Sequence, residues 1–151
     1  IRLLLLAFLL PIVLGDTSLY EELLGNGGRR MLKTYTNKYV QQYVHAHEFM
    51  EFWMSEPTPL AHFIIEKQKG NYVSFKMPDG RYVRDNLFFF VDFADKVDEW
   101  ELWMPVKNMD ETWSFQSTKG RWLSARGARR LINSSDKNLA CEHFSLEKWD
   151  P

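Results

Sequence analysis

The 151-residue sequence has only one cysteine, Cys141, and almost no net charge. A single cysteine excludes an intramolecular disulfide framework and a zinc site built from several cysteines. The 19 basic and 20 acidic residues give a formal charge of -1, which argues against a strongly basic nucleic-acid-binding protein and against an acidic disordered tail. We interpret Cys141 as a small buried apolar side chain rather than a partner for an intermolecular disulfide.

Sequence signatures of catalysis are also missing. There is no G-x-S-x-G nucleophile turn, no P-loop and no glycine-rich dinucleotide fingerprint. The acidic pairs Asp98-Glu99 and Asp110-Glu111 lie beside expected turns or strand ends. Neighbours in a strand point to opposite faces, which is poor geometry for a general acid and base. We therefore expect no catalysis and no cofactor.

Histidines are few, and they form no convincing metal site. His45 and His47 stand two apart on an expected strand, so both would face the same way. A third ligand would have to come from His62 or His143, because zinc sites usually need three or four ligands. Ordinary exposed or hydrogen-bonded histidines are the better interpretation, and we expect no metal.

The longest apolar stretch occupies residues 1–15, with one early charge at Arg2. It is too short for a transmembrane helix, which needs ~20 apolar residues. It has the size of a secretory h-region, and Val13-Leu14-Gly15 before Asp16 suits a cleavage site. We predict a signal peptide over 1–15, a secreted protein and no stable membrane span; the alternative is a buried N-terminal helix.

Residues 16–31 are predicted to be a flexible segment that precedes one domain over 32–151. A short helix is expected over 18–24, and the glycine-rich stretch 25–28 ends it as a linker. Arg29-Arg30 is either a processing site or, more commonly, a solvated pair of charges. Asn133 begins an N-glycosylation sequon, which would place its segment at the surface of a secreted protein.

An internal repeat organises the chain after residue 31. Laying 50–74 over 100–124 without a gap, an offset of 50 residues, matches several aromatic and aliphatic positions and the glycines of two turns. Self-similarity at such a period predicts one supersecondary unit used several times. Within each unit, apolar residues alternate with polar ones, as in Trp113, Phe115 and Ser117. Short alternating strands separated by glycine turns predict an all-β barrel or sandwich.

The third unit resembles a fascin-type β-trefoil. The resemblance rests on Trp113-Ser114-Phe115-Gln116-Ser117, on Gly120-Arg121-Trp122-Leu123-Ser124-Ala125 and on Phe144-Ser145-Leu146, with related turns at Asn37 to Val40 and Gly70 to Ser74. It implies three units of about four strands, which form a six-stranded barrel and a cap of hairpins. Unit boundaries are expected at 32–47, 48–97 and 98–141. Residues 142–149 would then close the barrel or pair with the start of the chain.

The aromatic residue after each turn is expected to fill the barrel. Tyr39, Tyr72 and Trp122 would point inward, because large rings bury much apolar area on few rotatable bonds.

A basic cluster in the third unit is the candidate binding site. Five cations fall within twelve residues of an otherwise acidic chain: Lys119, Arg121, Arg126, Arg129 and Arg130. Guanidinium groups suit sulfate, phosphate or carboxylate recognition through paired hydrogen bonds. A solvated loop with scattered charges explains the cluster equally well.

Two other families fit less well. Ricin-type sugar-binding trefoils carry a Gln-x-Trp triplet in each unit, which is lacking here, and a lipocalin would not explain the repeat. The sequence therefore predicts a secreted, non-enzymatic β-trefoil that binds a glycan, including a sulfated one, or an extracellular protein, and no nucleic acid. The alternative is a fascin-like, actin-binding cytoskeletal protein, if the apolar leader is not cleaved.

Overall fold

The alternating segments form short antiparallel strands in the computed structural model, which describes residues 20–43 and 48–151. The twelve strands of this part of the chain are β1 (Arg29–Lys33), β2 (Tyr39–Gln42), β3 (Met50–Met54), β4 (Phe63–Lys67), β5 (Val73–Lys76), β6 (Tyr82–Asp85), β7 (Val91–Ala94), β8 (Trp103–Lys107), β9 (Trp113–Ser117), β10 (Trp122–Ser124), β11 (Asn133–Ser135) and β12 (Ser145–Lys148). Between them lie short 3₁₀ turns: η1 (Asn26–Gly28), η2 (Pro59–Ala61), η3 (Leu87–Phe89), η4 (Glu99–Glu101), η5 (Ala128–Arg130) and η6 (Ala140–Glu142). The prediction of an all-β protein is confirmed.

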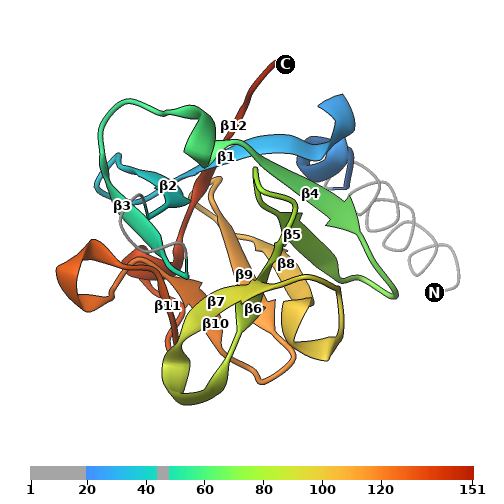
Figure 1. Ribbon diagram of the computed structural model, residues 1–151, viewed down its shortest axis with the longest axis vertical. Coiled ribbons are helices and arrows are strands. Elements are labelled where there is room, and N and C mark those ends of the chain that lie inside the picture. Colours follow the sequence, from blue (N-terminus) through green and yellow to red (C-terminus); the bar gives the residue numbers. More distant parts are fainter. Residues whose placement is uncertain (1–19, 44–47) are drawn as a thin grey trace, which may run out of the picture.

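Six strands surround the core in the order β12, β1, β4, β5, β8, β9 (Figure 1). Antiparallel pairing joins each neighbour to the next as far as β9. Between β9 and the start of β12 there is one bridge, in which the backbones of Trp113 and Phe144 exchange two hydrogen bonds of 2.8 Å. The last strand therefore meets the barrel on both sides, through β1 and through this bridge.

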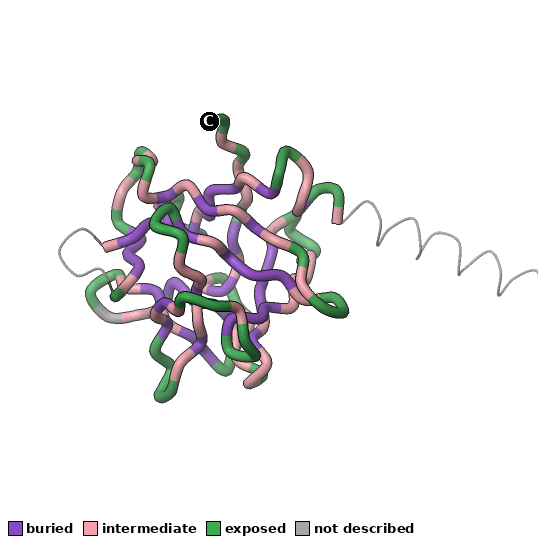
Figure 2. Tube along the Cα trace, turned by 45° about the vertical axis from the view of Figure 1, so that its right-hand side comes forward, coloured by how far each residue is buried: buried purple, intermediate pink, exposed green. Residues whose placement is uncertain are grey.

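The remaining six strands form three hairpins, β2-β3, β6-β7 and β10-β11. The hairpins β6-β7 and β10-β11 each follow one pair of barrel strands along the chain, and β2-β3 follows β1, whose partner is β12, so the same four-strand unit occurs three times. This arrangement is a β-trefoil, as the sequence predicts. Buried residues lie mainly along the strands, and the connecting loops are mostly exposed (Figure 2).

The repeat has a period of about 40 residues, so the predicted offset of 50 is wrong. The 3₁₀ turns that precede the first strand of each unit begin at Pro59, Glu99 and Ala140. An offset of 50 residues aligns β4 with β9. This alignment is wrong because β4 is the first strand of the second unit, whereas β9 is the second strand of the third unit. Both strands alternate apolar and polar residues and end at a lysine-glycine turn, which explains the false match.

The units are also divided differently from the prediction. The second unit comprises β4 to β7 and the third comprises β8 to β11, whereas β3 belongs to the first unit. The first unit is assembled from both ends of the chain, because β12 pairs with β1 over four residues (Figure 1). Pairing of the C-terminal segment with the start of the chain was one of the two predicted outcomes, and it is confirmed.

The barrel is filled by Phe63, Trp103 and Phe144, which are 1%, 0% and 0% exposed. These three residues stand at or directly before the first strand of each unit, and Phe75 and Phe115 pack between them with ring centroids 4.8 Å apart. The predicted plugs do not fill this role: Tyr72 and Trp122 are half-buried.

Tyr39, the third predicted plug, packs in a small separate cluster and donates a hydrogen bond to Glu147. The reason is the alternation of the strand. At both Tyr39-Val40 and Trp122-Leu123 the aliphatic residue that follows the ring takes the inward position.

The end of the predicted flexible segment is packed against the barrel. β1 begins at Arg29, Leu23 lies in the core, and Gly28 is buried. Arg30 is not a solvated charge: its guanidinium is buried and donates hydrogen bonds to the carbonyl oxygens of Glu22 (2.6 Å) and Gly25 (2.7 Å). Cationic donors at the C-terminal end of a helical turn satisfy carbonyl groups that the turn leaves free.

None of the helices in the described part of the chain has the length and apolarity needed to cross a bilayer. The predicted signal peptide, residues 1–15, lies outside the described residues.

Candidate functional site

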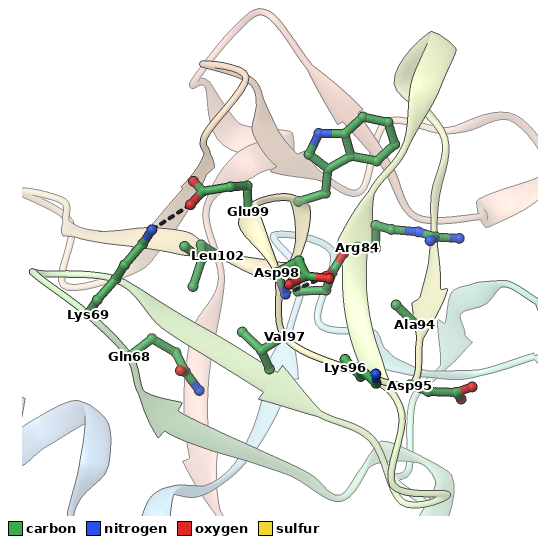
Figure 3. Close-up of a pocket in the computed structure, with 12 residues that line it drawn as sticks. Gln68, Lys69, Arg84, Ala94, Asp95, Lys96, Val97, Asp98, Glu99 and Leu102 are labelled. Carbon is green, nitrogen blue, oxygen red and sulfur yellow. Dashed lines mark hydrogen bonds and ion pairs between the residues drawn. The ribbon is translucent and has the colours of Figure 1, made fainter.

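A surface cleft of about 830 Å³ lies between the loop that follows β7 and the turn between β4 and β5 (Figure 3). The loop supplies residues 94–102, and the turn supplies Gln68 and Lys69. Arg84 of β6 lines the same cleft, where it forms a two-pronged pair with Asp92 (2.8 and 2.9 Å). This hydrogen bonding raises the pKa of Arg84.

All three residues of η4 line the cleft. Glu101, the last residue of this turn, is buried and accepts a hydrogen bond of 2.7 Å from the backbone N–H of Asp98. Burial raises the pKa of Glu101, and the bond from Asp98 partly opposes that shift. The carboxylate thus fixes the loop from inside, at a cost in desolvation.

Trp100 is the exposed aromatic side chain of the cleft, with 38% of its surface accessible. The Nζ of Lys119 lies 3.4 Å from the centroid of its ring, and burial lowers the pKa of this lysine. At the rim, Lys69 and Glu99 form an ion pair (Figure 3), and hydrogen bonding to Glu99 raises the pKa of Lys69. Thr118 donates a hydrogen bond to the carbonyl oxygen of Glu99 (2.8 Å), which ties the turn to the next unit.

These groups suit a ligand rich in hydroxyl groups. An indole ring provides a flat apolar face, and the carboxylates, amide and cations around it offer both acceptors and donors. Concave sites that combine an aromatic surface with a few polar groups are the usual form of a small-ligand site.

The predicted basic cluster is not a single patch of free cations. Arg121 pairs with the fully buried carboxylate of Asp85 (3.1 Å), and Lys119 donates a hydrogen bond to the carbonyl oxygen of Asp85 (2.7 Å). Arg126 pairs with the buried carboxylate of Glu142 (3.1 Å), which raises the pKa of the arginine. Three of the five predicted residues are therefore bonded to buried residues of the barrel, and Lys119 also lies beside the ring of Trp100.

The other two residues of the cluster, Arg129 and Arg130, are exposed on η5. They lie in the loop between β10 and β11, away from the residues that line the cleft.

The histidines are dispersed among the described residues, and no group of three or more metal-ligating side chains occurs there. His62 stacks on Trp149 with ring centroids 4.4 Å apart, and His143 pairs with Asp110 at 2.9 Å. The candidate ligands His45 and His47 lie outside the described residues.

A second hollow, of about 420 Å³, contains the His143–Asp110 pair together with the exposed ring of Tyr35. Hydrogen bonds from Thr112 and then from His143 lower the pKa of Asp110 to about 2. Cys141 is half-buried, so it is less buried than the sequence predicts.

Asn133 lies in β11 rather than in an exposed segment. Its Oδ1 atom is buried, and the two serines that complete the sequon are buried as well.

The cleft residues were missed in the sequence because none of them belongs to a recognised motif. In the sequence, the acidic pair Asp98-Glu99 suggests only a general acid and base, for which its geometry is poor. The available signal is an aromatic residue, Trp100, flanked by carboxylates in the loop between β7 and β8.

No protein-family model matches the chain, and no curated protein matches it. Among solved structures, it is similar to the GlcNAcα1-4Gal-releasing endo-β-galactosidase from Clostridium perfringens, with a TM-score of 0.71 and 13% sequence identity over 81% of the chain. The match covers 33% of that enzyme, so the chain spans about a third of its length. It is also similar to the BEL β-trefoil, with a TM-score of 0.67, 15% identity and coverage of 81% of this chain and 94% of that one. At these identities the likeness establishes a shared β-trefoil fold.

Proposed function

We propose that the protein is a carbohydrate-binding β-trefoil that holds its glycan in the cleft beside Trp100 and performs no catalysis. The observation that carries the proposal is the exposed indole of Trp100 in a concave surface lined by Gln68, Lys69 and Glu99. One of the two similar structures is an endo-β-galactosidase that releases GlcNAcα1-4Gal, which supports a carbohydrate as the ligand class. The ammonium group of Lys119 lies beside the indole and would attract a sulfate group, so the proposed ligands include sulfated sugars.

A glycan array probed with the full chain tests this proposal, and Trp100→Ala is the decisive variant. We expect the variant to bind the selected glycan about tenfold more weakly or worse, the usual scale for a buried aromatic anchor. Trp53→Ala is the matched control, because Trp53 is half-exposed on β3 and does not line the cleft. Equal losses in both variants, or a loss in neither, would contradict the assignment of the cleft.

Secretion is part of the same proposal. It rests on the apolar run over 1–15, and it predicts that protein recovered from the medium begins at Asp16. The fascin-like alternative rests on Gly120-Arg121-Trp122-Leu123 and requires an intact leader. N-terminal sequencing separates the two, because recovery from the cytosol with residues 1–15 present, together with co-sedimentation with actin filaments, would favour the cytoskeletal role.

A further inference from the structure

The loop between β6 and β7 displays four consecutive large apolar side chains to solvent. Leu87, Phe88, Phe89 and Phe90 are 54%, 81%, 41% and 57% exposed. Single exposed apolar residues are ordinary, but a contiguous group of this size marks an interaction surface. We call residues 87–90 the apolar tip (Figure 1, between β6 and β7).

Hydrogen bonds at Asn86, the residue that precedes the apolar tip, fix the backbone of the loop. The N–H of Asn86 donates to the carbonyl oxygen of Phe90 (2.7 Å), and the side chain of Asn86 accepts from the N–H of Leu87 (2.7 Å). Arg121 donates to the carbonyl oxygen of Asn86 (2.7 Å). The tip therefore keeps its shape through polar contacts, and its apolar side chains are not needed to fix it.

The equivalent loop of the next unit shows that this turn does not require aromatic residues. Phe88 and Phe89 have φ values of 57° and 66°, a region that bulky side chains rarely adopt. Arg129 and Arg130, at the corresponding places in η5, both have φ of 58°. One fold thus makes the same turn once with two arginines and once with two phenylalanines, so the aromatic choice reflects what the tip contacts.

Two arginines and a lysine lie on one side of the apolar tip, beside Phe89, and both arginines are also paired with buried carboxylates. The guanidinium carbon of Arg121 lies 4.7 Å from the centroid of the Phe89 ring. A hollow of about 330 Å³ beside Phe89 is also lined by Arg126 and Lys137, with Asp136 as its one acidic residue among those described. Apolar side chains on a protruding loop with basic side chains at their base match the two layers of a membrane surface, acyl chains and anionic headgroups.

We propose that the apolar tip inserts into the surface of a lipid bilayer that carries anionic headgroups. Phe88 enters the acyl layer, and Lys137 contacts the headgroups. The alternative partner is a protein with a groove that receives the tip. In that case the tip stays in water when vesicles are added, so the first experiment separates the two partners.

The first experiment measures the depth of one position. The full chain with Cys141→Ser carries a new cysteine, either Phe88→Cys or Met109→Cys, labelled with an environment-sensitive dye. Met109 is the matched control, because it is a fully exposed apolar residue on the turn between β8 and β9. With vesicles of phosphatidylcholine and phosphatidylserine, we expect the emission to shift to the blue at position 88 and to stay unchanged at position 109.

The label reports the surroundings of position 88 itself, so its emission distinguishes insertion of the tip from attachment of the chain through another segment. No shift at position 88, or equal shifts at both positions, overturns the proposal. Equal shifts at position 88 on vesicles of phosphatidylcholine alone overturn the role of anionic headgroups.

The second experiment tests the side chain itself. Phe88→Arg places at the tip the residue that the equivalent loop already carries, so the turn remains accessible to the backbone. We expect vesicle binding of the full chain to fall about tenfold, the scale of withdrawing one phenylalanine from an apolar layer. Met109→Arg adds the same charge elsewhere and should leave binding unchanged; an equal effect of both variants overturns the proposal. Glycan binding at the cleft should survive Phe88→Arg, so failure of one proposal leaves the other standing.

Discussion

Individual buried carboxylates fix the 3₁₀ turns that precede the third and the first unit of the barrel. Glu101 and Glu142 occupy equivalent places at the ends of η4 and η6, and both are almost fully buried. Each accepts a hydrogen bond from the backbone N–H three residues earlier, at Asp98 and Leu139. Glu142 also pairs with Arg126, whereas Glu101 forms an ion pair with none of the described residues. The two sites share a structural role but differ in how their charge is neutralised.

The stability of the protein should therefore depend on pH through Glu101. Burial raises the folded-state pKa of this group above its ordinary value of 4.5. The folded protein therefore favours the neutral acid. The stability that this group contributes is fully present below the unfolded-state pKa and is lost as the pH rises through the folded-state pKa. Glu101→Gln keeps an acceptor for Asp98 and removes the ionisation.

We expect Glu101→Gln to gain in free energy of unfolding, relative to the parent, between pH 4 and pH 7, measured by urea denaturation at both. Glu56→Gln removes one exposed carboxylate and shows how much of the change comes from net charge alone. A difference that is constant across this range, or that shrinks with rising pH, would contradict the assigned cause.

The sequence shows where charged residues lie along the chain, but it does not show which residues form ion pairs with one another. It shows five cations in a row of twelve positions, but it does not show that Arg121 meets Asp85, 36 residues earlier, or that Arg126 meets Glu142. Those partners are brought close only by the closure of the barrel. For the same reason Trp100 could not be placed in a cleft, because Gln68 and Lys69 come from a different pair of strands.

At the scale of elements, η1 shows how closely one turn fits against a strand. Gly28 has φ of 71°, and a Cβ atom there would lie 2.1 Å from the carbonyl oxygen of Ile65. Gly120 has a similar φ of 78°, but a Cβ atom would meet open space. Both positions disfavour L side chains by about 1–2 kcal/mol, and only Gly28 adds a steric conflict with β4.

Gly28→Ala should consequently destabilise the protein more than Gly120→Ala. Overpacking of this kind typically costs about 1–3 kcal/mol beyond the strain of the backbone, and guanidinium denaturation of both variants gives the difference. If the two variants unfold at the same denaturant concentration, η1 does not pack on β4 as described.

The strands were predictable because their pattern is local, whereas the register of the repeat was not. Alternating apolar residues and glycine turns identify β4, β9 and their neighbours directly. The first strand β4 and the second strand β9 share this pattern, so an ungapped comparison can match the wrong pair. The turns Gly80-Arg81-Tyr82-Val83 and Gly120-Arg121-Trp122-Leu123 give the correct period of 40. An arginine follows the glycine in both of these turns, whereas Asn71 follows Gly70. This one residue is the difference that distinguishes them from the turn at Gly70.

The corrected register changes which aromatic residue supports the barrel. Trp103 is fully buried and donates a hydrogen bond to the carbonyl oxygen of Val83 (3.1 Å), whereas Trp122 is half-buried. We expect Trp103→Ala to lose about 3–5 kcal/mol of stability and Trp122→Ala distinctly less. Thermal or chemical unfolding of the two variants checks the order, and a larger loss at Trp122 would restore the original assignment of the plugs.

On the scale of the whole molecule, the first unit exists only when both ends of the chain meet. β12 pairs with β1 from Arg30 to Lys33, and Leu146 packs against the main core opposite Leu32. The barrel therefore depends on a contact between segments more than 110 residues apart, and pairings of such long range form late and cooperatively. The sequence suggested this closure, because its third opening at Phe144-Ser145-Leu146 had no later strands of its own.

Removal of residues 145–151 should therefore abolish the cooperative fold rather than loosen one end. It exposes the edge of β1 and leaves the bridge between Trp113 and Phe144 at the new chain end. We expect this truncated chain to show no sigmoidal unfolding transition and to lose near-ultraviolet circular dichroism. A chain that ends at Trp149 is the control: it loses only two exposed residues and keeps the stack of Trp149 on His62 and the hydrogen bond from Trp149 to Phe63 (2.8 Å). If both truncated chains unfold cooperatively with similar midpoints, the remaining strands form the core without β12, and the assembly of the first unit from the two ends would not be what holds the trefoil together.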